Sequence, residues 1–320
     1  MIAGPDFVVL TGFLGSGKTT LLRNFLAHPA SADTAVIVNE IGEIGLDGAI
    51  LREGSGAEVA MAMLSNGCVC CSMGSTLATT VSALLQADRG DAGPLRRIVL
   101  ETSGLSKPGP VLRQLADMAE YRMRIGVVAT YDAERGPHST EFSEAAAQWA
   151  GAGTILVTKP DVVGPDRMAE AVAEAEAINP LARIIAVADR ADAIEQAFDL
   201  SHRPLPFKRI AERVVSQQHP KIGVLLLRLA HAVAYEDLAT WLDNLAGLLG
   251  ERLLRIKGLV RVAESEMPLL IQSVGTLFSA PRPFNSGEVE DGSFLVLIGR
   301  DVTSADVLTV APNLGWTNTR

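Results

Sequence analysis

Residues 7–22, FVVLTGFLGSGKTTLL, constrain the fold of this chain more than any other stretch. The apolar run Phe7–Leu10 predicts a buried parallel strand, and residues 20–25 can continue as a helix. The turn between them fits the spacing G-x-x-x-x-G-K-[ST] through Gly12, Gly17, Lys18 and Thr19. A strand, a glycine-rich turn and a helix in this order are typical of an α/β domain whose turn binds phosphate.

Each residue type in this turn suits a nucleotide. Glycines let several backbone N–H groups point inward, and the helix N-terminus adds partial positive charge to the same concavity. Lys18 can reach the β- and γ-phosphates, and the Thr19 hydroxyl can ligate Mg²⁺. The alternative is a glycine-rich turn that binds nothing. We favour a nucleotide site made of Gly12, Gly15, Ser16, Gly17, Lys18, Thr19 and Thr20.

Composition limits the class of protein. The 320 residues are 48% hydrophobic and 20% charged, which suits two soluble domains that each bury a core. The net charge of -9 and the lack of a basic block argue against nucleic acid or an anionic membrane as partner. Apolar stretches such as residues 223–234 are interrupted by Arg228 and His231, and the first ten residues lack a signal peptide's basic start. We therefore expect a cytoplasmic protein.

An acidic, glycine-rich loop follows the predicted strand Thr34–Val38, at the position of the first switch in P-loop switch proteins. Residues 39–51 contain three glycines that permit movement, and their acidic side chains could contact a cation. An ordinary solvated loop would have the same composition. The acidic residues are Glu40, Glu43 and Asp47.

The chain's three cysteines are Cys68, Cys70 and Cys71, just before a predicted helix at residues 75–86. Such a cluster excludes disulfides between distant segments, and Cys-x-Cys-Cys is too short for a zinc finger with two cysteine pairs. Three thiolates could bind Zn²⁺, Cu⁺ or Co²⁺ and leave a position for water or a carboxylate such as Glu43. Buried apolar cysteines and redox-active vicinal thiols are alternatives. The absence of cysteine elsewhere in the sequence favours metal binding.

Two later motifs fall at predicted strand ends. Residues 97–100 form a strand that runs into Glu101 and Gly104, the second-switch pattern in which the carboxylate holds Mg²⁺ indirectly and the glycine N–H meets the γ-phosphate. Strands at residues 125–130 and 154–157 precede Thr158-Lys159-Pro160-Asp161, the [NT]-K-x-D pattern. In it, Asp161 accepts from guanine N1 and N2 while the Lys159 stem packs along the ring, which favours guanine over adenine.

Alternating strands and helices predict a doubly wound α/β domain of the P-loop NTPase type over residues 1–200, with a mainly parallel sheet. Helix 166–178 and strand 184–187 complete it. Prolines and charges mark residues 201–220 as a linker. Residues 221–320 are expected to form a smaller α+β domain, with strands at 221–229, 259–265 and 294–299 and a helix at 235–254.

The motifs together resemble the CobW family of P-loop GTPases, which includes cobalamin-synthesis, nitrile-hydratase-activator and zinc-chaperone proteins. The resemblance covers nearly the whole chain, and Cys-x-Cys-Cys combined with the P-loop is its most specific feature. The matching segments are GFLGSGKTTLL, VNEIGEIGLD, SNGCVCC, ETSGLSKP, VTKPD, INP and RLLRIKGLVRV.

The resemblance implies slow GTP hydrolysis with Mg²⁺, coupled to binding zinc or cobalt and transferring it to a client metalloprotein. It implies a client-facing or regulatory C-terminal domain. By position, Lys18, Thr19 and Glu101 serve phosphate, Mg²⁺ and catalysis, Gly104 the second switch, and Lys159 with Asp161 the base. Cys68, Cys70 and Cys71, with Glu40 and Glu43, match the family's metal-site region.

Two features depart from the family. Lys107 stands where the second switch usually has an acid before the proline, and only His202 and His219 flank the linker in place of a histidine-rich tract. A nucleotide-gated metal sensor or scaffold and a small-molecule kinase remain alternatives. The sequence leaves open the physiological metal, the client, the residue that orients the attacking water, and whether the protein is a homo-oligomer.

Overall fold

A computed structural model describes residues 4–38, 60–63, 75–89, 93–187, 189–202, 205–216, 219–284, 292–310 and 312–318. Within these residues the chain divides into two compact units. The first comprises residues 1–172 and 182–203, and the second comprises residues 173–181 and 204–320.

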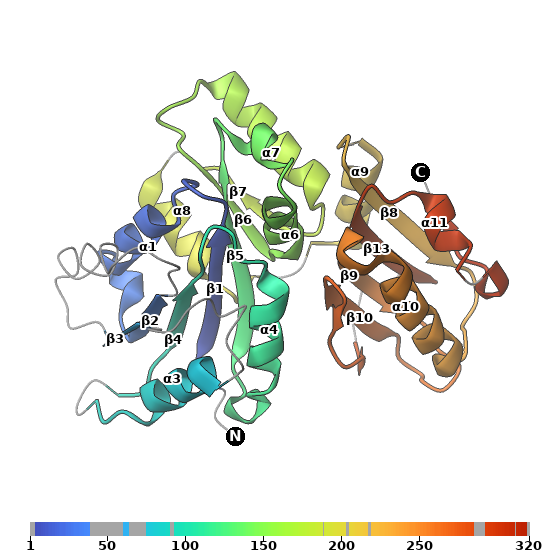
Figure 1. The fold of residues 1–320 in the computed structure, drawn as a ribbon, viewed down its shortest axis with the longest axis horizontal. Coiled ribbons are helices and arrows are strands. Elements are labelled where there is room, and N and C mark those ends of the chain that lie inside the picture. Colours follow the sequence, from blue (N-terminus) through green and yellow to red (C-terminus); the bar gives the residue numbers. More distant parts are fainter. Residues whose placement is uncertain are drawn as a thin grey trace. The chain divides into compact units, whose positions relative to one another are not determined.

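The first unit is built on a sheet in which every described strand pair is parallel (Figure 1). Its strands are short apolar runs rich in Val, Ile and Leu, as expected for a sheet covered on both faces. In spatial order they are β3 (Ala60–Met63), β2 (Thr34–Val38), β4 (Arg97–Glu101), β1 (Asp6–Gly12), β5 (Arg124–Asp132), β6 (Thr154–Thr158) and β7 (Arg183–Ile185). β1 lies in the centre, so the residues that follow it are close to several strand ends.

Helices cover both faces of this sheet, as a doubly wound fold requires. Helices α1 (Lys18–Leu26) and α8 (Arg190–Phe198) contact each other on one face, where the rings of Phe25 and Phe198 stack with centroids 3.9 Å apart. On the other face, α4 (Pro108–Ala116) packs against α3 (Ser75–Gln86) and α6 (Ser143–Gly151). The remaining elements are η1 (Pro29–Ser31), η3 (Ala119–Tyr121) and α5 (Gly136–Ser139). Helix α7 (Pro165–Ile178) begins in this unit, and its residues from 173 onward belong to the second.

The second unit has an antiparallel sheet, whose central strands pair in continuous register except for one shift between Ile298 and Gly299. Its order is β11 (Leu277–Phe278), β10 (Leu269–Val274), β9 (Leu253–Val260), β13 (Ser293–Arg300), β8 (Ile222–Leu229) and β14 (Thr317–Asn318), and β12 (Arg282–Pro283) pairs with β10. The other elements are α9 (Phe207–Ser216), α10 (Tyr235–Leu249), η4 (Gly250–Arg252), α11 (Ser304–Leu308) and η5 (Pro312–Leu314).

Helix α10 supplies much of the core of the second unit. Its buried side chains recur at helical spacing, so one apolar stripe faces the sheet. The Trp241 and Trp316 rings stack in this core with centroids 4.9 Å apart. The buried residues of α10 are Leu238, Trp241, Leu242, Leu245 and Leu249.

The predicted fold class is confirmed, and several boundaries differ. The helix expected at residues 235–254 ends at Leu249 because Gly250 adopts a φ of +52°, and residues 253–260 form a strand. The segment expected as a linker contains helix α9. Strands β3, β10, β11, β12 and β14 are additional to those expected. No helix in the described part of the chain is long and apolar enough to cross a membrane.

Candidate nucleotide-binding site

Four strands of the first unit end in residues of the candidate site. Gly12, Glu101, Asp132 and Thr158 are the last residues of β1, β4, β5 and β6. The register pairs Leu10 with Glu101, Gly12 with Thr130, and Asp132 with Thr158. Because parallel strands present their carboxyl ends at one edge, motifs far apart in the sequence meet here, where doubly wound sheets bind ligands.

The predicted phosphate-binding turn is present between β1 and α1. Gly15 and Gly17 have φ values of +70° and +94°, which favour glycine, and helix α1 begins at Lys18. No side chain caps this helix, and the partial positive charge of a helix N-terminus favours an anion. Thr20 lies exposed on the first turn of the helix.

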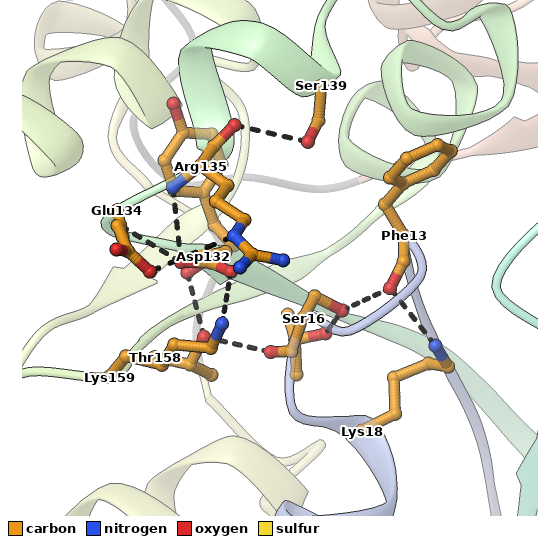
Figure 2. A network of polar contacts seen from close by, with 11 residues as sticks. Phe13, Ser16, Lys18, Asp132, Glu134, Arg135, Ser139, Thr158 and Lys159 are labelled. Atoms are coloured by element: carbon orange, nitrogen blue, oxygen red, sulfur yellow. Dashed lines mark hydrogen bonds and ion pairs between the residues drawn. The ribbon is translucent and has the colours of Figure 1, made fainter. Parts of the chain in front are cut away.

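The turn is fixed to the neighbouring strand through Ser16, whose side chain is buried (Figure 2). The Ser16 hydroxyl donates to the Phe13 carbonyl at 2.7 Å and lies 2.6 Å from the Thr130 hydroxyl on β5. At Gly12, a Cβ atom would lie 2.0 Å from Thr130 Oγ1, so only glycine fits. Lys18 Nζ donates to the Phe13 carbonyl at 3.2 Å, which holds the ammonium over the turn.

Thr19 and Glu101 are brought into direct contact. The Thr19 hydroxyl donates to Glu101 Oε1 at 2.7 Å, although 82 residues separate the two in sequence. Glu101 is buried at the end of β4. A hydroxyl beside a carboxylate is an oxygen donor set that suits Mg²⁺. The two residues predicted to serve the magnesium ion therefore fit it.

The base-binding motif is tied to the phosphate-binding turn. The Thr158 hydroxyl lies 2.9 Å from the Ser16 carbonyl and 3.1 Å from the Tyr131 carbonyl, so its single proton is shared between them. Lys159 Nζ forms an ion pair with Asp132 Oδ2 at a distance of 2.5 Å, and Figure 2 shows the contact. This directs the Lys159 ammonium toward the end of β5, and Asp161 lies exposed two residues later.

The sequence patterns did not identify the residues that support the motifs. Asp132 is buried, and its Oδ1 accepts from the N–H groups of Glu134 and Arg135 at 2.9 and 3.2 Å. Thr130 and Gln148 contact the turn and the second switch, respectively. The position of Asp132 at a strand end was the one sequence signal available, because the other contacts depend on the fold.

The predicted transition-metal ligands Cys68, Cys70, Cys71, Glu40 and Glu43 lie outside the described residues. In the part of the chain that is described, no group of three or more His, Cys, Asp or Glu side chains could hold a metal ion. His202 and His219 have local backbone contacts: a ring nitrogen of His202 lies 3.0 Å from the Asp199 carbonyl, and that of His219 accepts from Lys221 and Ile222.

The family model for the CobW/HypB/UreG nucleotide-binding domain matches residues 6–186, which include the phosphate turn, the second switch and the base motif. The chain belongs to the CobW/HypB/UreG family. A second model, for the cobalamin synthesis protein CobW C-terminal domain, matches residues 222–309 of this family member.

Two zinc-chaperone relatives of this CobW/HypB/UreG protein match over most of their length. The zinc chaperone YjiA of Escherichia coli is 28% identical over 93% of this chain and 95% of its own. The zinc chaperone CobW of a Sinorhizobium species is 28% identical over 91% of both chains. The crystal structure of zinc-bound YjiA GTPase has a TM-score of 0.67 at 24% identity, covering 98% of this chain and 99% of that one, and shows the same fold.

Proposed function

We propose that this P-loop GTPase hydrolyses GTP to drive the binding of a transition metal, zinc or cobalt, and its delivery to a client metalloprotein. The hydrogen bond from Thr19 to Glu101 is the observation that carries the proposal. It joins the first turn of α1, which follows the phosphate turn, to the start of the second switch. Loss of the terminal phosphate would therefore change the conformation of the second switch.

Each residue of the site has a separate role in the proposed reaction. The turn from Gly12 to Gly17 surrounds the phosphates with N–H groups, and Lys18 places a positive charge on the β- and γ-phosphates. Thr19 and Glu101 would hold Mg²⁺, Thr19 directly and Glu101 through water, and the ion when bound neutralises charge on the phosphate oxygens. Gly104 would offer its N–H to the γ-phosphate.

Guanine is the proposed base. Asp161 is exposed and can accept hydrogen bonds from guanine N1 and N2, whereas adenine would leave that carboxylate unpaired. The Thr158 contact with Ser16 supports this proposal, because it sets the base motif at a fixed position relative to the phosphates.

The proposed metal site is Cys68, Cys70 and Cys71, with Glu40 and Glu43 contributed by the first-switch segment. Three soft thiolates suit zinc, and an incompletely enclosed ion can be passed to a recipient. The names of the relatives, zinc chaperones, support zinc as the cargo. Coupling to GTP follows because the cysteines lie between the two switch segments in sequence.

The first test is a zinc and cobalt competition titration of the reduced protein without nucleotide, with GDP, and with a nonhydrolysable GTP analogue plus Mg²⁺. A variant with all three cysteines changed to serine is the control. We expect the metal affinity to depend on the nucleotide and to be lost in the variant. Tight metal binding with the same affinity in all three nucleotide states would indicate a passive metal site. No metal binding at all would refute the assignment as a metallochaperone.

Hydrolysis is tested separately by Lys18→Ala, which should abolish turnover and weaken nucleotide binding. Normal turnover by this variant would remove the assignment of the active site. A small-molecule kinase would show transfer of phosphate that an acceptor stimulates, and a metal sensor would hydrolyse nothing appreciable even with metal present. Measuring inorganic phosphate with and without zinc separates these alternatives.

A further inference from the structure

Gln148, on helix α6, is a buried side chain that makes two contacts with the second-switch turn. Its Nε2 donates to the carbonyls of Gly104 and Ser106, each at 2.9 Å, and the residue is 0% exposed. The two carbonyl acceptors fix the orientation of the amide, because a flipped Oε1 would face both of them. Gln148 therefore uses both hydrogens of its amide on the backbone of one loop.

Other hydrogen bonds also hold the turn that Gln148 contacts. The Ser106 N–H donates to the Ser103 carbonyl at 3.0 Å, which closes a turn over residues 103–106. Just before the turn, Thr102 donates its N–H and its hydroxyl to the Leu10 carbonyl on β1, at 2.9 and 3.2 Å. The turn is thus held by β1 at its start and by α6 at Gly104 and Ser106.

Gly104 itself lies against the phosphate-binding turn. A Cβ atom at this position would lie 2.9 Å from the backbone nitrogen and 3.0 Å from the Cα of Leu14. The distance between the second switch and the phosphate turn therefore depends on how the peptide units around Gly104 are oriented. Gln148 fixes one of those units directly, through the Gly104 carbonyl.

Helix α6 is also connected to the phosphate turn. At its start, the Phe142 ring stacks on Phe13 with centroids 4.8 Å apart. At the next position after Gln148, the Trp149 indole donates to the Thr130 carbonyl at 3.0 Å, and the Thr130 hydroxyl contacts Ser16. One helix therefore sets the second switch relative to the phosphate turn.

We propose that Gln148 is a positioning residue that holds the Gly104 turn where it can meet the γ-phosphate, and so makes this site favour GTP over GDP. The inference rests on the proposed function. Without the amide, the turn would have to be ordered when GTP binds, at a cost that GDP does not incur because it lacks the γ-phosphate. The side chain acts on the backbone and has no direct role in the reaction.

The test compares the affinities of wild type and Gln148→Met for GDP and for a nonhydrolysable GTP analogue, both with Mg²⁺. Methionine keeps the volume and removes both donors. We expect the affinity for the analogue to fall about 10-fold, or roughly 1.4 kcal/mol, and that for GDP to change less than about twofold. Ala145→Gly is the matched control, since it weakens the same buried helix without touching the turn; its ratio of affinities should remain that of the wild type.

A second variant, Gln148→Glu, covers the case in which the methionine variant does not fold. An ionised carboxylate has no donor for either carbonyl, whereas the protonated acid has one. The variant's analogue affinity, relative to wild type at the same pH, should therefore rise as the pH is lowered from 8 to 6. The GDP affinity of the same variant should change less with pH, whereas a residue that only stabilises the helix would change both affinities alike.

Equal losses for GDP and the analogue, an unchanged ratio, or a gain for the analogue would overturn the inference. If the Gln148 variants give one of these results while wild type hydrolyses GTP, the inference about Gln148 is wrong and the proposed function still stands. If wild type binds neither nucleotide, both are refuted.

Discussion

Guanine recognition is expected to depend on one exposed carboxylate, that of Asp161. In Asp161→Asn the side chain can no longer accept from both guanine N1 and N2. Because a hydrogen bond to a charged group contributes about 1.5–3 kcal/mol, we expect GTP affinity to fall about 10- to 100-fold. Xanthosine triphosphate has an oxygen at position 2 that the asparagine amide can donate to, so its affinity should rise.

The measurement is a competition titration of GTP, ATP and xanthosine triphosphate against a fluorescent nucleotide, in wild type and Asp161→Asn. Asp166→Asn is a suitable control, since Asp166 is also an exposed acid and lies on the following helix, α7. Unchanged GTP affinity in Asp161→Asn would contradict the assignment of this residue to the base.

The ion pair between Lys159 and Asp132 is expected to stabilise the fold even without nucleotide. The Asp132 side chain is 6% exposed, so Lys159→Met would leave a buried carboxylate with only its two backbone donors. We expect the free energy of unfolding to fall by about 1–3 kcal/mol, as measured by urea denaturation of the nucleotide-free protein.

Adding Asp132→Asn should recover part of the loss, because the amide still accepts those N–H groups without a charge. A double variant no more stable than Lys159→Met would show that the charge is not the cause.

At the scale of elements, the start of strand β8 depends on the protonation of His219. Its Nδ1 accepts from the N–H groups of Lys221 and Ile222, each at 3.2 Å, so the neutral ring fits this position. Burial lowers the pKa of His219, Glu174 opposes the shift and Lys221 adds to it. The folded protein therefore binds a proton at His219 less readily than the unfolded chain does.

The sign of the effect on stability follows from linkage. As the pH falls through the ordinary histidine pKa of about 6.5, the unfolded state takes up the proton first, so stability decreases toward the lower folded pKa. We expect His219→Asn, whose side-chain oxygen can accept the same N–H groups, to lose less stability than wild type between pH 7 and pH 5. Denaturation midpoints measured across this range check it, and parallel pH profiles for the two proteins would refute it.

At the scale of the whole molecule, the two units have buried clusters of their own among the described residues. One cluster of buried residues lies between Val8 and Phe198 and the other between Leu225 and Trp316, with no member in common among the described residues. The nucleotide motifs all belong to the first unit. Ligand binding should therefore stabilise that unit.

Hydrogen exchange with and without GDP measures this directly. At about 100 times the dissociation constant, the slowest amides of β1, β4 and β5 should gain about 2.7 kcal/mol of protection, and those of β8, β9 and β13 should not change. Lys18→Ala at the same GDP concentration is the control, because it should bind the nucleotide weakly. Equal gains in both sheets of the wild type would mean that the two cores unfold as one.

Much of this protein follows from short stretches of its sequence. The spacing of Gly12, Gly17, Lys18 and Thr19 specifies a turn and a helix start by local geometry, and apolar runs separated by helices specify a parallel sheet. Because parallel strands end at one edge, the order of motifs alone placed Glu101 near the phosphate turn, and its contact with Thr19 confirms that placement. Helix ends were less predictable, as Leu249 and the strand that begins at Leu253 illustrate.

The tertiary structure decided which residues support these motifs. Ser16 with Thr130, Lys159 with Asp132, and Gln148 with Gly104 are separated by 114, 27 and 44 residues. No local pattern specifies such pairs, since they depend on strand register and on how a helix packs over the sheet. The fold class and the nucleotide motifs could be predicted from the sequence, because backbone conformation and hydrophobic periodicity are local properties. The contacts that fix the second switch required the fold, because the partner of a buried polar group is set by what packing brings within hydrogen-bond distance.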